Sequence, residues 1–462
     1  MSPFLLLAQF ALADVTYGKT FSADQVLSPY IYVFYAAFIV AFLFTPVMRT
    51  VATYYGIIDQ PDQLRKMHST PVAYLGGVAV FLGWITGLAV SQFVLLHHAA
   101  LYPDERVIVK FSIVIGASVI VVLGLWDDIK KISPRMKITG QVVAAVFMLS
   151  EGVGTHCTGP LLSPVGVRLQ MWTQGHAGPE AFFPEWFVVA SSCVVVVALV
   201  VFCCNATNLM DGLDGLCGGV TGVIAAGFLF LAVHLAMTGG GLNANRDALR
   251  VVLGLALLGS VLGFVPYNFN PASIFMGDTG SMFLGFACAT QIILLADERP
   301  KWFLAAIVMF ALPILDTVLA FTRRYVNKRP LFSADRFHFH HQLLARGLTV
   351  RKTVVLSYGL AIGFVLLGGF IVFMRTRYAV AFYLVIFGSI IVAAFKMGMV
   401  HERPRVVKRQ PLGSSSGVAS IDVTPSTPTL EPGTVIEIRD DSAEGTSPTP
   451  ATPVAGAWEE PA

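Results

Sequence analysis

Long apolar segments, separated by short polar ones, make up most of the chain. A helix needs about 20 apolar residues to cross a hydrocarbon core about 30 Å thick, and this rule gives about eleven candidate transmembrane helices. The fourth is the weakest candidate, because Glu151 interrupts it early. The pattern predicts an all-α polytopic membrane protein. The candidate helices begin near Tyr30, Tyr74, Val107, Ile138, Phe187, Gly215, Leu249, Ser281, Trp302, Val354 and Ala379.

The composition agrees with a membrane protein. Of the 462 residues, 55% are hydrophobic and 13% are charged, and the mean hydropathy is +0.71, whereas about a quarter of the residues in a soluble domain are charged. The net charge of +3 is too small to indicate nucleic-acid binding. From residue 403 to 462 the sequence is rich in Pro, Ser, Thr, Gly and Glu and lacks hydrophobic periodicity, which predicts a disordered tail.

Lysine and arginine residues gather in alternate loops, within residues 59–71, 127–137 and 323–352. The long Gly/Pro-containing segment from Glu151 to Glu185 has few for its length. Cytoplasmic loops of membrane proteins are enriched in Lys and Arg, so the basic loops and the tail are predicted to be cytoplasmic. With an odd number of spans the N-terminus lies outside and the C-terminus inside. Residues 1–27 are predicted to be a short outward-facing leader, followed by a transmembrane domain over residues 28–402.

Five polar clusters fall in loops on this same predicted side. Carboxylates with a nearby amide oxygen suit Mg²⁺, which usually keeps some waters and also binds substrate phosphates. Lys, Arg and His side chains beside them can hold those phosphates, and Gly-rich turns let backbone amides approach an anion. The pattern therefore predicts a site for a metal-bound diphosphate at the membrane surface. The clusters span residues 59–77, 127–137, 205–216, 268–281 and 335–341.

Each cluster also has a simpler interpretation. Asp127 and Asp128 could form a turn or a helix cap, and the lysines after them could be only a topology signal. Asp211 and Asp214 could be solvated loop acids. The histidines near residue 340 could bind zinc, although no cysteine accompanies them. Five such clusters on one membrane face are hard to explain in this way, so we favour a functional site.

The polar clusters contain four motifs: Asp127-Asp128, Asn205-x-x-Asn208-x-x-Asp211-Gly-x-Asp214-Gly-Leu, Phe275-Met-Gly-Asp278-Thr-Gly-Ser and Asp335-Arg-x-His338-x-His340-His341. Together they resemble the polyprenyl-phosphate N-acetylhexosamine-1-phosphate transferases of the glycosyltransferase family 4 type. The resemblance implies transfer of a sugar 1-phosphate from a UDP-sugar to a polyprenyl phosphate, undecaprenyl phosphate in bacteria, with release of UMP. It makes the transmembrane domain catalytic and implies the bacterial inner (plasma) membrane, with the active site on the cytoplasmic face.

The last motif separates branches of the family. The branch that uses UDP-MurNAc-pentapeptide for peptidoglycan typically has three consecutive histidines after a proline. The spacing of His338, His340 and His341 instead resembles the branch that uses UDP-GlcNAc to start O-antigen, enterobacterial common antigen or teichoic acid linkage lipids. The resemblance therefore favours UDP-GlcNAc, with phospho-MurNAc-pentapeptide transfer as the alternative. The two substrates and membrane lipid are the implied partners, and a homodimer is left open.

The resemblance also implies roles for single residues. Mg²⁺, with Mn²⁺ as an alternative, would bind Asp278 and Asn208. Asp127 would deprotonate or orient the lipid phosphate, with Asp128 beside it holding charge and water, and Asp211 would shape the substrate-binding loop. We favour direct displacement over an aspartyl-phosphate intermediate, because the lipid phosphate is already an anionic nucleophile. The groups that would contact the diphosphate or sugar are Lys137, His338, His340 and His341, and those that would hold the uridine are Asp214, Asn268 and Phe275.

Two rival functions come from other classes. A transporter would need a polar site near the middle of the membrane, whereas the polar clusters here lie in loops. Asp316 is the exception, since it lies within the ninth candidate helix. A scaffold without catalysis would not need Asp127, Asp128 and Asp278.

Overall fold

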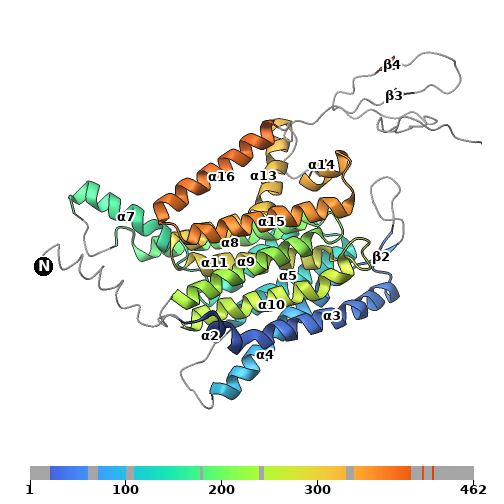
Figure 1. Ribbon diagram of the computed structural model, residues 1–462, viewed down its shortest axis with the longest axis horizontal. Helices are drawn as coiled ribbons and strands as arrows, with labels where there is room; N and C mark the ends of the chain where they lie inside the picture. The colour runs from blue at the N-terminus through green and yellow to red at the C-terminus, as the bar shows by residue number, and fades with distance from the viewer. Residues whose placement is uncertain are drawn as a thin grey trace, which may run out of the picture. The chain divides into compact units, whose positions relative to one another are not determined.

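The computed structural model is a helical bundle (Figure 1), and it describes residues 21–60, 71–99, 109–176, 181–238, 244–328, 338–396, 408–409 and 419–420. Contacts divide the chain into a unit of residues 1–400 and a unit of residues 401–462. In the second unit only a short antiparallel pair is described, β3 (Lys408–Arg409) with β4 (Ala419–Ser420). The rest of the predicted tail, most of the predicted leader and the Asp335-Arg336 pair lie outside the described residues.

The first unit contains nearly all of the described secondary structure. A short strand pair, β1 (Ile58–Asp59) with β2 (Val72–Ala73), lies between the helices α3 and α4. The described helices are α2 (Ala23–Leu27), η1 (Ser28–Tyr30), α3 (Ile31–Tyr54), α4 (Gly76–Ala99), α5 (Phe111–Lys130), α6 (Pro134–Ser150), α7 (Gly159–Gln174), α8 (Glu185–Met210), α9 (Leu216–Thr238), α10 (Ala244–Asn268), α11 (Gly277–Ala296), α12 (Pro300–Met309), α13 (Ala311–Val326), α14 (Phe339–Ala345), α15 (Val350–Val372) and α16 (Thr376–Lys396).

The helices confirm a polytopic membrane protein. Among the described residues, 8 helices are long and apolar enough to cross a membrane, and the number is 9 if α12 and α13 count as one span bent by 71°. All of the segments predicted to span the membrane are helical, but α6 has 17 residues and the apolar part of α16 is short. The sequence did not predict α7, which lies in the segment interpreted as an outer loop.

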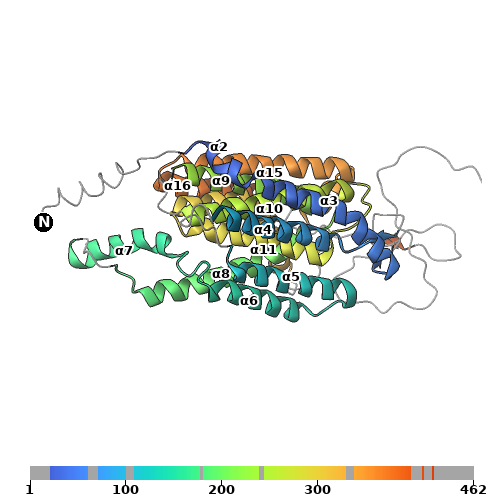
Figure 2. The same ribbon diagram turned by 90° about the horizontal axis from the view of Figure 1, so that it is seen from below.

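Helix α11 lies at the centre of the bundle (Figure 2) and is buried along nearly its whole length. Small residues let neighbouring backbones approach it. A Cβ atom built on Gly124 of α5 would lie 2.4 Å from the Thr279 Cα, and one built on Gly285 would lie 2.4 Å from the Cys203 carbonyl oxygen of α8. These contacts leave no room for larger side chains, so they fix the depth of α11 between α5 and α8.

Helix α6 runs antiparallel to α5 along its full length (Figure 2). At one end of the pair, Lys137 near the start of α6 contacts Asp127 near the end of α5. At the other end, the Lys110 ammonium donates to the Glu151 carbonyl at 2.7 Å, and the Ser112 amide donates to the Glu151 carboxylate at 3.1 Å. The α6 segment is therefore as deep as α5, although it is shorter than an ordinary span.

The polar loops meet at one end of the bundle. Ala73 of β2 forms a parallel bridge with Ile274, and its carbonyl accepts from the Phe275 amide at 2.8 Å. The first and fourth polar clusters are joined in this way. From α15, Arg351 donates to the Asn270 carbonyl at 3.0 Å, and the Tyr358 hydroxyl donates to the Gly215 carbonyl at 2.6 Å.

Candidate active site

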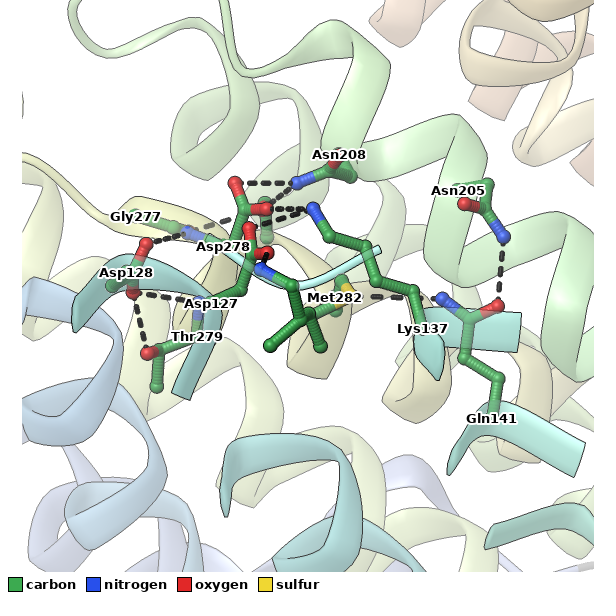
Figure 3. A network of polar contacts seen from close by, with 12 residues as sticks. Asp127, Asp128, Lys137, Gln141, Asn205, Asn208, Gly277, Asp278, Thr279 and Met282 are labelled. Atoms are coloured by element: carbon green, nitrogen blue, oxygen red, sulfur yellow. Dashed lines mark hydrogen bonds and ion pairs between the residues drawn. The ribbon is translucent and has the colours of Figure 1, made fainter. Parts of the chain in front are cut away.

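Asp127, Lys137 and Asp278 form the centre of the site (Figure 3). The Lys137 ammonium lies 2.7 Å from Asp127 Oδ2 and 2.5 Å from Asp278 Oδ2. Asp127 lies in the last turn of α5, Lys137 in the first turn of α6 and Asp278 in the first turn of α11. Two carboxylates thus share one cation in a partly buried place, where charges interact more strongly than in water.

The turn between α5 and α6 explains how Asp127 and Lys137 meet. Lys131 ends α5 in a left-handed conformation, with φ 46°, and the Ile132 amide donates to Asp127 Oδ1 at 2.8 Å. Ser133 then caps α6 by accepting from the Met136 amide. The chain reverses within a few residues, so the last turn of one helix faces the first turn of the next.

Asp128 caps the N-terminus of α11. Its Oδ1 accepts from the Asp278 amide at 2.8 Å, and its Oδ2 accepts from the Thr279 amide at 3.1 Å and the Thr279 hydroxyl at 2.6 Å. A negative charge at this end of a helix is favourable. The conformation needs Gly277, since its φ is 71° and a Cβ atom there would lie 2.6 Å from Asp128 Oδ2. Asp128 therefore holds Asp278 in place, and its predicted role of holding charge and water stays a prediction.

Asn208 lies on the other side of Asp278, in the last turn of α8. Its amide nitrogen donates to Asp278 Oδ1 at 2.9 Å and to the Ser281 hydroxyl at 3.0 Å. One turn earlier, Asn205 donates to the Gln141 side chain at 2.8 Å, which ties α8 to α6. Asn208 is thus next to Asp278, as the metal-site hypothesis requires, but its nitrogen rather than its oxygen faces the carboxylate.

Asp211 follows the end of α8. Burial raises the pKa of Asp211 to about 8, and the neighbouring carboxylates of Asp278, Asp128 and Asp214 raise it further in the same direction. An acid with this pKa is largely protonated at neutral pH, so it adds little negative charge to a place that already holds several carboxylates.

This pKa predicts a change of stability with pH. Between about pH 4 and about pH 8 the folded protein holds the Asp211 proton more tightly than the unfolded chain, so the group lowers stability as pH rises through this window. The Asp211→Asn side chain cannot ionise. The melting temperature of this variant is therefore expected to fall less steeply than that of wild type as pH rises through this window, and to be higher than that of wild type at pH 8. Melting curves in detergent with EDTA would measure this, with Glu185→Gln, an exposed carboxylate, as the control. An unchanged slope for Asp211→Asn would contradict the assignment.

Asp214 and Asn268, predicted to hold uridine, hold loops together in this structure. Asp214 Oδ2 accepts from the Asn270 side chain at 2.9 Å and the Ala272 amide at 3.0 Å. Asn268 is buried and accepts from the Gly215 amide at 3.0 Å. Their contacts join the third and fourth polar clusters, and the predicted uridine contacts stay predictions.

Phe275 is partly exposed beside Tyr74, and their ring centroids are 5.9 Å apart. Burial and the Asp59 carboxylate raise the pKa of Tyr74 well above its usual range. Sequence reasoning missed Tyr74, although an aromatic residue two positions before the Gly76-Gly77 pair was a visible signal. The two rings leave an aromatic surface where stacking on a base is feasible.

The three histidines form a second group on a different loop. The ring centroids of His338 and His340 are 5.7 Å apart, and those of His340 and His341 are 4.3 Å apart. Burial lowers the pKa of His340 to about 3, so this ring is neutral at physiological pH. His340 packs on Gly212, where a Cβ atom would lie 2.3 Å from its Nε2. The group thus contacts the loop that carries Asp211 and Asp214.

The residues at the centre fit a hard divalent cation. In the part of the chain that the structure describes, no three His, Cys, Asp or Glu side chains form a ready-made metal cluster. Mg²⁺ commonly binds only one or two carboxylates and completes its shell with water and phosphate oxygens. Asp127 and Asp278 already converge on one cation, the Lys137 ammonium, and offer only oxygen atoms. Asn208 could join them once its amide turns to present oxygen.

Comparisons with known proteins show which family the chain is similar to. Residues 110–296 match the model of a family described as Glycosyl transferase family 4. A protein of Bacillus subtilis (strain 168) named probable undecaprenyl-phosphate N-acetylglucosaminyl 1-phosphate transferase is 32% identical, over 74% of this chain and 84% of the relative. The decaprenyl-phosphate N-acetylglucosaminephosphotransferase of Mycobacterium tuberculosis (strain ATCC 25618 / H37Rv) is 31% identical, over 77% and 85%.

A third relative is more distant. The undecaprenyl-phosphate alpha-N-acetylglucosaminyl 1-phosphate transferase of Escherichia coli (strain K12) is 28% identical, over 68% of this chain and 77% of the relative. The family match begins just before α5 and ends with α11, so it includes Asp127, Asn208 and Asp278. From these matches, the chain belongs to glycosyl transferase family 4, as its motifs predicted.

Proposed function

We propose that this protein transfers N-acetylglucosamine 1-phosphate from UDP-GlcNAc to a polyprenyl phosphate, such as undecaprenyl phosphate, giving the polyprenyl-diphosphate sugar and UMP. The observation that carries the proposal is the convergence of Asp127, Lys137 and Asp278 at one end of a membrane bundle. The relatives named above act on undecaprenyl or decaprenyl phosphate with N-acetylglucosamine, which favours this sugar over MurNAc-pentapeptide.

In the proposed reaction, an oxygen of the lipid phosphate attacks the β-phosphorus of UDP-GlcNAc, and the bond from that phosphorus to the bridging oxygen breaks. UMP leaves with the electron pair of that bond. Lys137 would neutralise charge on the diphosphate as it develops, and Asp127 would orient the lipid phosphate or accept its proton. This is electrostatic stabilisation with positioning, the usual basis of phosphoryl transfer catalysis.

Mg²⁺ or Mn²⁺ would bind through Asp278 and Asp127, with Asn208 beside them. Such an ion supplies Lewis-acid stabilisation of phosphate oxygens. Asp128 would keep Asp278 at the start of α11 through its three hydrogen bonds. The histidine group and the Phe275–Tyr74 pair would contact the sugar and the uracil.

The proposed topology is eleven spans with the site facing the cytoplasm of a bacterial inner membrane. It is supported by α6. Helices α5 and α8 both have their C-terminal ends at the site, so α8 begins on the opposite side of the membrane. The chain must therefore cross the membrane once between the end of α5 and the start of α8, and α6 is the helix that lies there. It is also supported by the Lys and Arg residues of the site loops. The N-terminus would then lie outside and the C-terminus inside.

A donor panel tests the function. Purified protein in detergent with undecaprenyl phosphate and Mg²⁺ is expected to form lipid-linked sugar from UDP-GlcNAc at least about 100-fold faster than from UDP-MurNAc-pentapeptide, a ratio that a site hydrogen-bonded to its sugar can reach. EDTA should stop the reaction, and added Mg²⁺ or Mn²⁺ should restore it. A preference for the MurNAc donor would move the protein to the peptidoglycan branch, and no transfer from either donor would overturn the proposal.

A further inference from the structure

Asp316 is a buried carboxylate outside the site described above. It lies on α13, beyond the 71° bend that separates α13 from α12, and only 3% of its surface is exposed. Burying an ionised carboxylate is costly unless its oxygens are hydrogen-bonded. Among the described residues, its two hydrogen-bond partners are His338 and Phe339, which both belong to the histidine loop.

Both oxygens of Asp316 hold the start of α14. Oδ1 accepts from the Phe339 amide at 2.7 Å, and Oδ2 lies 3.1 Å from Nδ1 of His338. His338 is the residue that caps α14, and Phe339 is the first residue of that helix. One carboxylate thus fixes both the ring of His338 and the backbone direction of the short helix that carries His340 and His341.

The position of α14 matters because of what His340 touches. The ring is 2% exposed and lies against Gly212 so closely that no Cβ atom fits there. Its Nε2 has no hydrogen-bond partner within the described part of the chain. A buried polar atom without a partner is costly, and this atom faces the loop between α8 and α9. Gly212 follows Asp211, so the ring adjoins the proposed active site.

We propose that Asp316 is a positioning residue, which holds the group His338, His340 and His341 against the α8–α9 loop so that it can bind the diphosphate or sugar of the nucleotide donor. This inference rests on the proposed function. Asp316 touches no substrate in this account, and it acts through His338 and α14. Its bond to Nδ1 also leaves Nε2 of His338 as the nitrogen available to a ligand.

A double-mutant cycle separates positioning from a general structural role. Asp316→Asn and His338→Gln are each expected to raise KM for UDP-GlcNAc about tenfold or more, as expected from loss of a hydrogen bond to a charged group. The change in kcat should be smaller. The KM of the double variant should stay within about twofold of the KM of His338→Gln, because the effects of substituting two residues in contact do not add. The inference would be overturned if the KM increases of the two single variants multiplied in the double variant, or if KM were unchanged in Asp316→Asn.

Two further variants guard against misfolding. Asp247→Asn removes another buried carboxylate, which is paired with Arg250 at 2.8 Å and is remote in sequence from the site loops. It should lower the melting temperature without changing KM. Gly212→Ala should raise KM as Asp316→Asn does, since a methyl group there would displace His340, although the substitution removes no titratable group.

Hydrogen exchange gives a readout that does not need catalysis. Asp316→Asn should speed exchange of the amides of residues 339–345 and 211–215, whereas Asp247→Asn should leave them protected as in wild type. If wild type shows no transfer but this pattern holds, the proposed function fails and the positioning stands. If wild type is active and exchange is unchanged in Asp316→Asn, the positioning role is wrong.

Discussion

Asp278→Asn is expected to lower kcat by about 10²- to 10³-fold, the range found when one preorganised stabiliser of transition-state charge is removed. Asp278 contacts both Lys137 and Asn208 and lies in the first turn of the central helix α11. The neutral amide loses the charge that would bind Mg²⁺, so we also expect half-saturation to need at least about tenfold more Mg²⁺, as for loss of one ligand interaction. Steady-state kinetics across a Mg²⁺ series would measure both changes.

The matched control for this variant is Asp247→Asn. Asp247 is a buried carboxylate in the first turn of α10, and it is paired with Arg250 rather than Lys137. Its kcat and Mg²⁺ dependence should match wild type once the folded fraction is accounted for. If Asp278→Asn kept more than about a third of wild-type kcat with unchanged Mg²⁺ dependence, Asp278 would not be a metal ligand in the reaction. That threshold lies well outside the loss expected from one stabilising group.

Lys137→Met is expected to change turnover and metal affinity in opposite directions. Removing the ammonium leaves Asp127 and Asp278 facing each other without their shared cation, so kcat/KM should fall about 100-fold or more, as for loss of a charge that stabilises the transition state. The same change removes a positive charge that competes with a divalent ion. Half-saturation should therefore need less Mg²⁺ than in wild type.

The control for the lysine is Lys301→Met, since the Lys301 ammonium lies at the start of α12, where it donates to the Val372 carbonyl at 2.9 Å and lies over the Trp302 ring. It should leave kcat/KM and Mg²⁺ dependence unchanged. Lys137→Arg should recover part of the lost activity because the charge is kept. If Lys137→Met needed more Mg²⁺ than wild type, the shared-cation account of Asp127 and Asp278 would be refuted.

The sequence predicted the class of fold and the residues that gather at the site. Hydrophobic length located the long apolar helices, because a membrane demands long apolar segments whatever their partners. The order of Asp127, Asn208 and Asp278 in separate loops was enough to predict one polar surface. The structure brings these residues into direct or shared contact, which is what the motif pattern required.

The partners of individual side chains were beyond sequence reasoning. Asp127 and Asp128 are adjacent, yet one faces Lys137 and the other caps α11, because successive residues on a helix point in directions about 100° apart. That division depends on where α11 packs, which no local pattern encodes. Asp214 and Asn268 likewise have hydrogen bonds to distant loops that only the assembled bundle defines.

Breaks in helices were also hard to predict. The ninth apolar segment is a single candidate span in the sequence, but it bends by 71° between α12 and α13. The bend places Asp316 at the histidine loop, so this charged residue of a predicted span accepts from the Phe339 amide and lies 3.1 Å from Nδ1 of His338. In the same way α7 formed in a Gly/Pro-containing segment, where local composition favoured a loop.

The central claim is that the chain moves sugar together with its phosphate. Purified protein with UDP-GlcNAc labelled with ³²P at the β-phosphate, undecaprenyl phosphate and Mg²⁺ tests it directly, because the position of the label and the identity of the released nucleotide distinguish the two modes of transfer. We predict that the label enters the lipid fraction and that UMP is released in equal amount. Release of UDP with the label left in the aqueous phase would show transfer of the sugar alone and would contradict the account.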